Sequence, residues 1–169
     1  MTTPNRERTV STVMLPAERI AQLRTLAETE GITITELIER WINAEIAAER
    51  LPDILPNFEV TATKGRVWFI VKDFSFPTMT PVQAEQVADV LIEIAEAKDI
   101  PGKRALLGTG EDEISLKVVR KGRGVLINGE DVRTGRAVTA SLTPGMARDL
   151  ARIIRNEAAK AAKHYEEEE

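Results

Sequence analysis

The residues with the clearest chemical potential are Arg120, Lys121, Gly122 and Arg123, which lie between two apolar runs. Their position predicts the tip of a β-hairpin, because both flanking runs are rich in strand-forming residues. Cations on a rigid tip can lie along a phosphate backbone, so Arg120, Lys121 and Arg123 are candidate DNA contacts. Ordinary charges at a solvated turn are the alternative. The glycines do not indicate a phosphate-binding loop, because the GxxxxGK spacing is absent.

The side chains that enzymes most often use are scarce or poorly placed. The chain has no cysteine and one histidine, His164, so thiolate metal sites and a His-dependent triad have almost no material. Acidic residues cluster at 111–113 and 130–131, but neither cluster lies in an apolar setting suited to acid–base catalysis. We therefore expect no enzyme, no cofactor and no metal site.

Charge is distributed unevenly along the chain, whose 169 residues carry a net charge of −4. Residues 103–163 contain 13 Lys or Arg against 7 Asp or Glu, whereas residues 51–102 contain 4 against 8. The last six residues, HYEEEE, form an acidic tail. A basic C-terminal half suits contact with DNA, and ordinary surface charge is the alternative.

The composition indicates a folded protein of the cytoplasm. Hydrophobic residues make up 43% of the chain, which is enough for a core. Aromatic residues make up 4%, which argues against a broad base-stacking surface. No apolar run approaches the roughly 20 residues of a membrane span, and the N-terminus lacks the apolar region of a signal peptide. We expect no membrane partner.

The first fifty residues predict a short strand and two helices. Residues 9–15, TVSTVML, favour an extended strand that Pro16 ends. An amphipathic helix follows, with its apolar stripe at Ile20, Leu23, Leu26 and Ala27. Gly31 provides the left-handed stop. Thr33 and Glu36 then form a capping box, which starts a second helix that runs to about Arg50.

The remainder predicts an α+β domain that contains a repeat. Strands are expected around a Lys64-Gly65 turn, over residues 113–119 and 124–127, and over 136–142. Helices begin at Thr80-Pro81 and at Thr143-Pro144, 63 residues apart. The spacing predicts a duplicated β-β-α unit whose copies form one antiparallel sheet with two helices. The predicted domains are residues 1–50, a Pro-containing linker at 51–56, residues 57–163, and the acidic tail at 164–169.

The stretch VSTVMLPAERIAQLRTLAETEGITITELIERWINAEI resembles the ribbon-helix-helix family of DNA-binding proteins. The resemblance covers about residues 8–48. It rests on the order of a strand ending in Leu15-Pro16, an amphipathic helix, a turn at Gly31, and a capped helix containing Glu36-Leu37-Ile38. In that family, two chains pair their N-terminal strands, which here implies a homodimer through antiparallel strands 9–15. A fifty-residue unit buries too little surface to be stable alone, which also favours a dimer.

The resemblance also implies how DNA would be bound. The two-stranded ribbon enters the major groove, and strand alternation turns Ser11, Val13 and Leu15 toward the core. The outward residues, which the family uses to contact bases, are here Arg8, Val10, Thr12 and Met14. Thr33 and Thr35, at the start of the second helix, would hold a phosphate.

The resemblance implies a sequence-specific transcriptional repressor or autoregulator from a prokaryote or phage. The chain departs from the family pattern, since Val10 and Met14 are apolar, and Ile34 and Glu39 occupy positions where Arg is common. Each missing cation removes a phosphate contact. The alternative is a dimeric interaction protein, antitoxin-like or partition-like, in which the first fifty residues serve only for dimerisation. In either case the C-terminal domain is a candidate for binding a protein partner.

Overall fold

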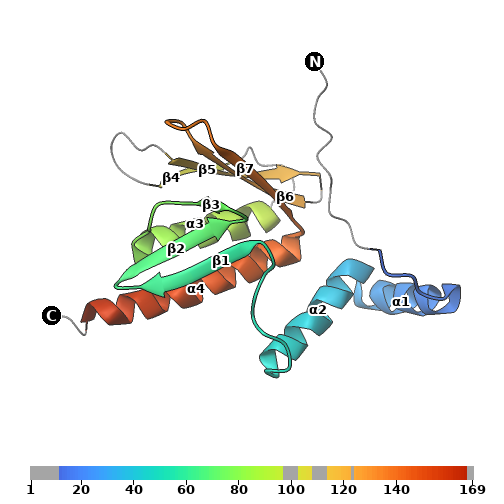
Figure 1. Cartoon of the computed structure of the whole chain (residues 1–169). Helices are drawn as coiled ribbons and strands as arrows, with labels where there is room; N and C mark the ends of the chain where they lie inside the picture. Colours follow the sequence, from blue (N-terminus) through green and yellow to red (C-terminus); the bar gives the residue numbers. More distant parts are fainter. Residues whose placement is uncertain (1–11, 97–102, 108–113, 123, 167–169) are drawn as a thin grey trace, which may run out of the picture. The chain divides into compact units, whose positions relative to one another are not determined.

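The computed structural model describes residues 12–96, 103–107, 114–122 and 124–166, with four helices and seven strands among them (Figure 1). The chain divides into two compact units, Met1–Ala44 and Glu45–Glu169. The elements are α1 (Ala17–Glu30), α2 (Ile34–Ala47), β1 (Phe58–Thr63), β2 (Arg66–Val71), β3 (Phe74–Ser75), α3 (Pro81–Glu96), β4 (Lys103–Leu107), β5 (Ile114–Lys121), β6 (Gly124–Asp131), β7 (Ala137–Leu142) and α4 (Pro144–Glu166). The protein is therefore of mixed α+β class, as predicted.

The first unit contains α1 and most of α2. The predicted residues end α1 and start α2, whereas α2 ends at Ala47 rather than near the predicted Arg50. Gly31 has φ +67°, and its N–H donates to the Glu28 carbonyl, while the N–H of Ile32 donates to the Ala27 carbonyl. This double closure satisfies carbonyls at the end of α1 that have no partner within the helix. At the start of α2, the N–H of Thr33 donates to Glu36 Oε2 at 2.8 Å, and the N–H of Glu36 donates to Thr33 Oγ1 at 3.1 Å. The capping box is confirmed.

The second unit has two antiparallel sheets rather than the single predicted sheet. One has three strands in the order β1-β2-β3, and the other has four in the order β4-β5-β6-β7. Each sheet is followed along the chain by one helix, α3 or α4. The prediction of two strands before α3, the first helix of the second unit, was wrong. Phe74–Ser75 adds a third strand on the open edge of β2. Residues beyond it stay beside β2, with Met79 exchanging two backbone hydrogen bonds with Val67.

The 63-residue spacing extends beyond the two helix starts to the buried face of both helices. At each start a threonine hydroxyl accepts a backbone N–H, Thr80 from Gln83 and Thr143 from Met146. Five buried positions then match at the same spacing: Ala84 and Ala147, Val87 and Leu150, Ala88 and Ala151, Leu91 and Ile154, Ala95 and Ala158. Small residues at three of these five positions allow α3 and α4 to pack closely along each other.

Each helix packs mainly on the sheet that it does not directly follow in the chain. The helix α4 packs on β1 and β2, which precede α3 in the chain, and α3 packs on β5 and β6, which precede α4. The N–H of Ala62, on β1, donates to Glu157 Oε2 on α4. Arg120, on β5, donates to the carbonyls of Ile94 and Ala95 at the end of α3. The helix that follows each sheet therefore mainly covers the other sheet.

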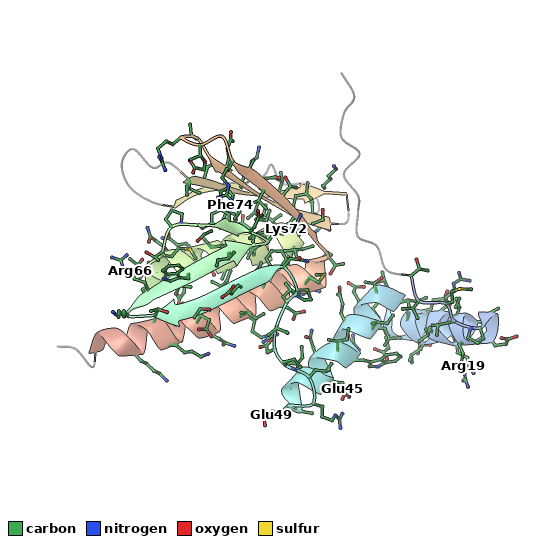
Figure 2. All side chains as sticks on the ribbon, viewed as in Figure 1. Arg19, Glu45, Glu49, Arg66, Lys72 and Phe74 are labelled. Carbon is green, nitrogen blue, oxygen red and sulfur yellow. The ribbon has the colours of Figure 1, made fainter. Side chains whose placement is uncertain are left out.

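Polar contacts join the β2–β3 turn to the second sheet. Lys72 Nζ donates to the Thr139 carbonyl at 2.9 Å, and Arg136 Nη2 donates to the Asp73 carbonyl at 3.2 Å. Figure 2 shows Lys72 and Phe74 close together at the end of the first sheet nearest the second. The two sheets are thus held together at this end of the unit.

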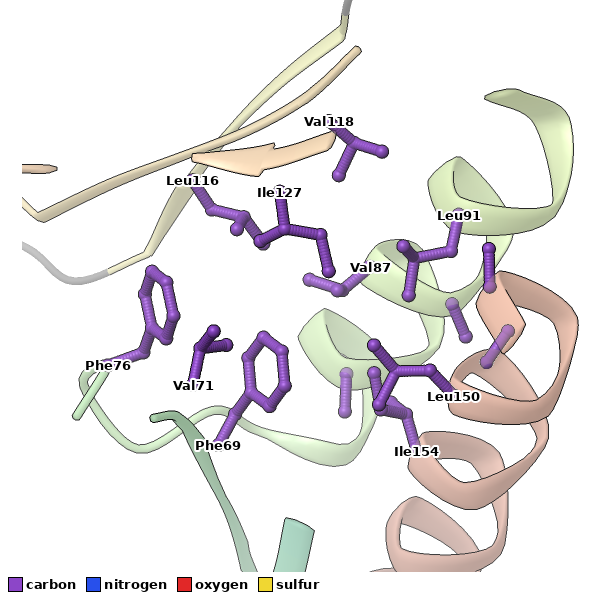
Figure 3. Packing of buried hydrophobic residues seen from close by; sticks show 14 of the residues in the cluster. Phe69, Val71, Phe76, Val87, Leu91, Leu116, Val118, Ile127, Leu150 and Ile154 are labelled. Atoms are coloured by element: carbon purple, nitrogen blue, oxygen red, sulfur yellow. The ribbon is translucent and has the colours of Figure 1, made fainter. Parts of the chain in front are cut away.

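The core of the second unit lies between the two sheets and the helix pair (Figure 3). Its members in the figure include Phe69, Val71 and Phe76 from the first sheet and its continuation, Leu116, Val118 and Ile127 from the second sheet, Val87 and Leu91 from α3, and Leu150 and Ile154 from α4. The rings of Phe69 and Phe76 stack with centroids 5.2 Å apart. A Cβ added at Gly129 would lie 2.6 Å from Phe76 Cζ, so glycine is required for Phe76 to pack here.

Candidate nucleic-acid interface

Residues 12–16, which directly precede α1, are exposed in a single chain. Thr12 and Met14, two of the predicted base contacts, are exposed and belong to neither strand nor helix. Met14 has 92% of its surface exposed and Val13 has 80%. Arg8 and Val10 lie outside the described residues. A strand needs a partner for its backbone groups, so the absence of a strand at 12–15 is compatible with a ribbon that forms only between two chains.

The apolar stripes of α1 and α2 are only half covered within the first unit. Ala27 and Leu37 are buried. By contrast, apolar side chains on both helices remain 40% to 47% exposed, namely Leu26, Ile38, Trp41 and Ile42. Leu15, immediately before the first helix, is 42% exposed. We call these five residues the apolar face of the first unit; a face of this composition is typical of a surface that another chain covers.

The predicted phosphate contacts at the start of α2 differ in availability. Thr33 caps the helix, and both its N–H and its hydroxyl donate to Glu36 Oε2. Thr35 is exposed in the first turn. A phosphate bound here would have to displace the Glu36 carboxylate from Thr33 or use the following turn. Of the two threonines, Thr35 is therefore the better placed for a phosphate.

The basic hairpin forms as predicted, but its three cations are not equivalent. Arg120 is half-buried, and its guanidinium donates to the carbonyls of Ile94, Ala95 and Gly122. These bonds satisfy the C-terminal end of α3, where a cation is favoured. Lys121 is exposed at the tip, and Arg123 lies outside the described residues. Arg120 therefore stabilises the fold, and Lys121 is the better candidate for a phosphate contact.

The sequence reasoning missed a second basic tip, in the first copy of the repeat. Lys64 and Gly65 join β1 to β2 with φ values of +47° and +71°, as a two-residue hairpin turn requires. Lys64 and the following Arg66 are exposed, and neither forms an ion pair within the described ranges. Figure 2 shows Arg66 at the turn end of this hairpin. The signal lies in the Thr-Lys-Gly-Arg stretch, where two cations flank the glycine of the predicted turn.

Most of the cations on α4 are paired with acidic side chains, so they are poorly suited to binding an anion. Arg152 contacts Asp53 in the predicted linker, with Nη2 and Oδ1 2.9 Å apart, and Asp149 at 3.6 Å. The hydrogen bond to Asp53 is the main cause that raises the pKa of Arg152. Arg155 pairs with Asp89 of α3 at 2.5 Å. The positive charge of this region is therefore partly neutralised by the protein itself.

Neither a metal centre nor a membrane-spanning helix is found in the portion of the chain that the structure describes. No group of three His, Cys, Asp or Glu side chains there is arranged to hold an ion. None of the described helices is long and apolar enough to cross a membrane.

Comparison with known proteins leaves the chain without an identified relative. No protein-family model matches it, and neither a curated protein nor a solved structure does.

Proposed function

We propose that the protein is a homodimer that binds double-stranded DNA and acts as a transcriptional repressor or autoregulator in the cytoplasm of a prokaryotic cell. The first unit supplies the dimer contact and the DNA-reading ribbon, as in the ribbon-helix-helix family that it resembles. The second unit adds contacts to DNA, to a second dimer or to a protein partner.

The observation that carries this proposal is the apolar face of the first unit. Its two helices leave four large apolar side chains 40% to 47% exposed. Only two residues, Ala27 and Leu37, are buried in the described part of the first unit. Asn43 Oδ1 is also buried there without a hydrogen-bond partner among the described residues. A second copy related by two-fold symmetry can cover the apolar side chains and pair the strands at 9–15, because such a contact is self-complementary.

Binding to DNA rests on the ribbon and on exposed groups that can contact phosphates. Thr12 can donate to a base edge or contact a thymine methyl group, while Met14 can make only apolar contacts. Of the predicted phosphate contacts, Thr35 and Lys121 are exposed and best placed. Thr33 and Arg120 already form hydrogen bonds within the fold. Because phosphate neutralisation provides most non-specific affinity, loss of an exposed cation that contacts DNA should weaken binding to any duplex.

A dimeric interaction protein is the second candidate. It is favoured by the apolar character of Met14 and by the use of Arg120 in capping α3. In that case the first unit only dimerises, and the second unit binds another protein.

Duplex binding across a salt series distinguishes these two functions. The probe is a labelled duplex from the region upstream of the protein's own coding sequence, with a scrambled duplex as the comparison. Thr12→Ala is expected to reduce the preference for the specific duplex. Lys121→Ala should weaken binding to both duplexes and lower the salt slope by about 1. Lys160→Ala is the matched control, because Lys160 is paired with Glu157 at 2.5 Å and should leave the slope unchanged.

Absence of salt-dependent binding to either duplex would overturn the DNA-binding proposal and support the interaction protein. Equal loss of affinity in Lys121→Ala and Lys160→Ala would show that the hairpin tip has no special role.

A further inference from the structure

We propose that the outer face of the β1-β2-β3 sheet binds single-stranded nucleic acid, with one base stacked on Trp68 and phosphates held by Lys64 and Arg66. This site lies in the second unit and does not depend on the ribbon, so it goes beyond the proposed function.

Trp68 lies on the central strand of this sheet and points away from the core. It alternates with the fully buried Val67 and Phe69, and it retains 47% of its surface exposed. Thr61 is directly opposite on β1, and Thr78 precedes the Met79 that pairs with Val67 on the other side. Trp68 is therefore a flat aromatic surface flanked by two exposed threonines. Any base can stack on an indole, whatever its sequence.

The same face carries two cations, Lys64 and Arg66, and one acid, Glu59 on β1. Arg66 is two residues before Trp68 on β2, so both side chains point outward, and Lys64 is in the adjoining turn. Neither cation has an ion-pair partner in the described parts of the chain, although most cations of α4 have one. A single-stranded nucleic acid complements this arrangement, because one base can stack on Trp68 while neighbouring backbone phosphates contact the cations.

The second copy of the repeat shows that packing does not require these residues. Aligning Val67 with Val125 and Phe69 with Ile127, which are all buried, places Leu126 at the position of Trp68. The same alignment places Gly124 at the position of Arg66. The aromatic ring is thus a feature of one hairpin only, whereas both hairpin tips carry cations. A role outside the core accounts for this difference.

Fluorescence anisotropy of a labelled twelve-residue oligothymidine tests the site. Trp68→Ala is expected to weaken binding about ten-fold to a hundred-fold, the range for loss of one stacked base, and Trp68→Phe should retain most of the affinity. Replacing both cations, Lys64→Ala with Arg66→Ala, should weaken binding and flatten its salt dependence. Lys117→Ala, at an exposed lysine on the other sheet, is the matched control and should bind as the wild type does.

Tryptophan emission gives a second readout. The oligothymidine should quench the wild-type emission and have much less effect on Trp68→Phe. Unchanged affinity in Trp68→Ala, or equal quenching in both proteins, would overturn the proposal. Tighter binding of a polyglutamate peptide, with the same dependence on Lys64, Arg66 and Trp68, would overturn it in favour of an acidic protein partner. Thr12→Ala should not alter oligothymidine binding, so failure here is separable from failure of the duplex proposal.

Discussion

The backbone N–H of Ala62 donates a hydrogen bond of 2.9 Å to Oε2 of Glu157, which joins the first strand of one repeat to the helix of the other. Arg120 and Ile94 form the corresponding contact in the second copy, with Arg120 Nη1 3.2 Å from the Ile94 carbonyl. In one contact the helix contributes a side chain, and in the other the strand does. The two strand–helix contacts occupy corresponding positions in the fold but use different donors and acceptors.

Replacing Glu157 by alanine is expected to destabilise the second unit by about 1–3 kcal/mol, because the N–H of Ala62 would lose a charged acceptor. Glu157→Gln should cost less, since the amide oxygen can still accept. Chemical denaturation measures both. The control is Lys160→Ala, which removes only the exposed partner of Glu157 and should change stability by less than about 0.5 kcal/mol. Equal effects of Glu157→Ala and Lys160→Ala would contradict the role given to the Ala62 contact.

Arg120 and Lys121 are neighbours with opposite expected behaviour. Arg120→Ala should lower the free energy of unfolding by about 1–3 kcal/mol, because carbonyls at the end of α3 lose a charged donor. Lys121→Ala should leave stability nearly unchanged, since its side chain is exposed at the turn. Thermal unfolding of the two variants provides the comparison. A larger loss in Lys121→Ala than in Arg120→Ala would contradict the assignment.

Gly129→Ala is expected to destabilise the protein by about 1–3 kcal/mol through overpacking. The new methyl group would lie 2.6 Å from Phe76 Cζ and 2.9 Å from Val138 Cγ1, closer than side chains tolerate. Combining it with Phe76→Leu should recover part of the loss, because a smaller side chain leaves room for the methyl group. A double-mutant cycle in denaturant measures this coupling. Strict additivity would show that Phe76 is not the obstacle.

The apolar face of the first unit predicts a dimer that a charge can break. Ile42→Glu places a carboxylate where 46% of an isoleucine is exposed in the single chain, and it should yield a monomer by light scattering. Val132→Glu makes a similar exchange at a more exposed side chain of the second unit and should remain dimeric. A wild-type chain that is monomeric at micromolar concentration would remove both the dimer and the ribbon.

The turn after β6 predicts a small effect of acid on stability. Asp131 Oδ1 accepts from the N–H groups of Arg133 and Thr134 at 3.0 Å each, and the hydrogen bonding to Thr134 is the main cause that lowers the pKa of Asp131. A carboxyl group whose pKa is lower when folded stabilises the protein above its unfolded pKa, and the contribution is lost as pH falls through the folded value. The acid limb of a stability profile below about pH 4 should therefore be shallower in Asp131→Asn. An unchanged limb would contradict this.

The local signals of the sequence were sufficient for the helices and most of the hairpins. Gly31 and the Thr33–Glu36 pair delimit α1 and α2, and Lys64-Gly65 joins β1 to β2, because each depends on neighbouring residues alone. The strand β3 was missed because two residues, Phe74 and Ser75, are too few for an alternating pattern, and Pro77 follows them closely. Residues 103–107, which form β4, were also unassigned, since two of the five are cations.

The arrangement of the elements could not be derived from such signals. The pattern of buried and exposed residues along a strand is the same whether two hairpins join in one sheet or form two sheets. No local feature of the sequence therefore distinguishes the predicted single sheet from the two sheets that form. The role of Arg120 was equally hidden, because its acceptors at Ile94 and Ala95 are more than twenty residues away. The charges in the sequence identify the basic hairpin tip. Only the fold shows that Arg120 caps α3 while Lys121 remains exposed.

The packing of each helix mainly on the other sheet has a consequence for how the second unit can be divided. Cutting the chain between Glu96 and Lys103 would give two fragments, each carrying a sheet and the helix that belongs on the other fragment's sheet. Neither fragment could complete its own core, yet the two together should reassemble spontaneously as a split protein.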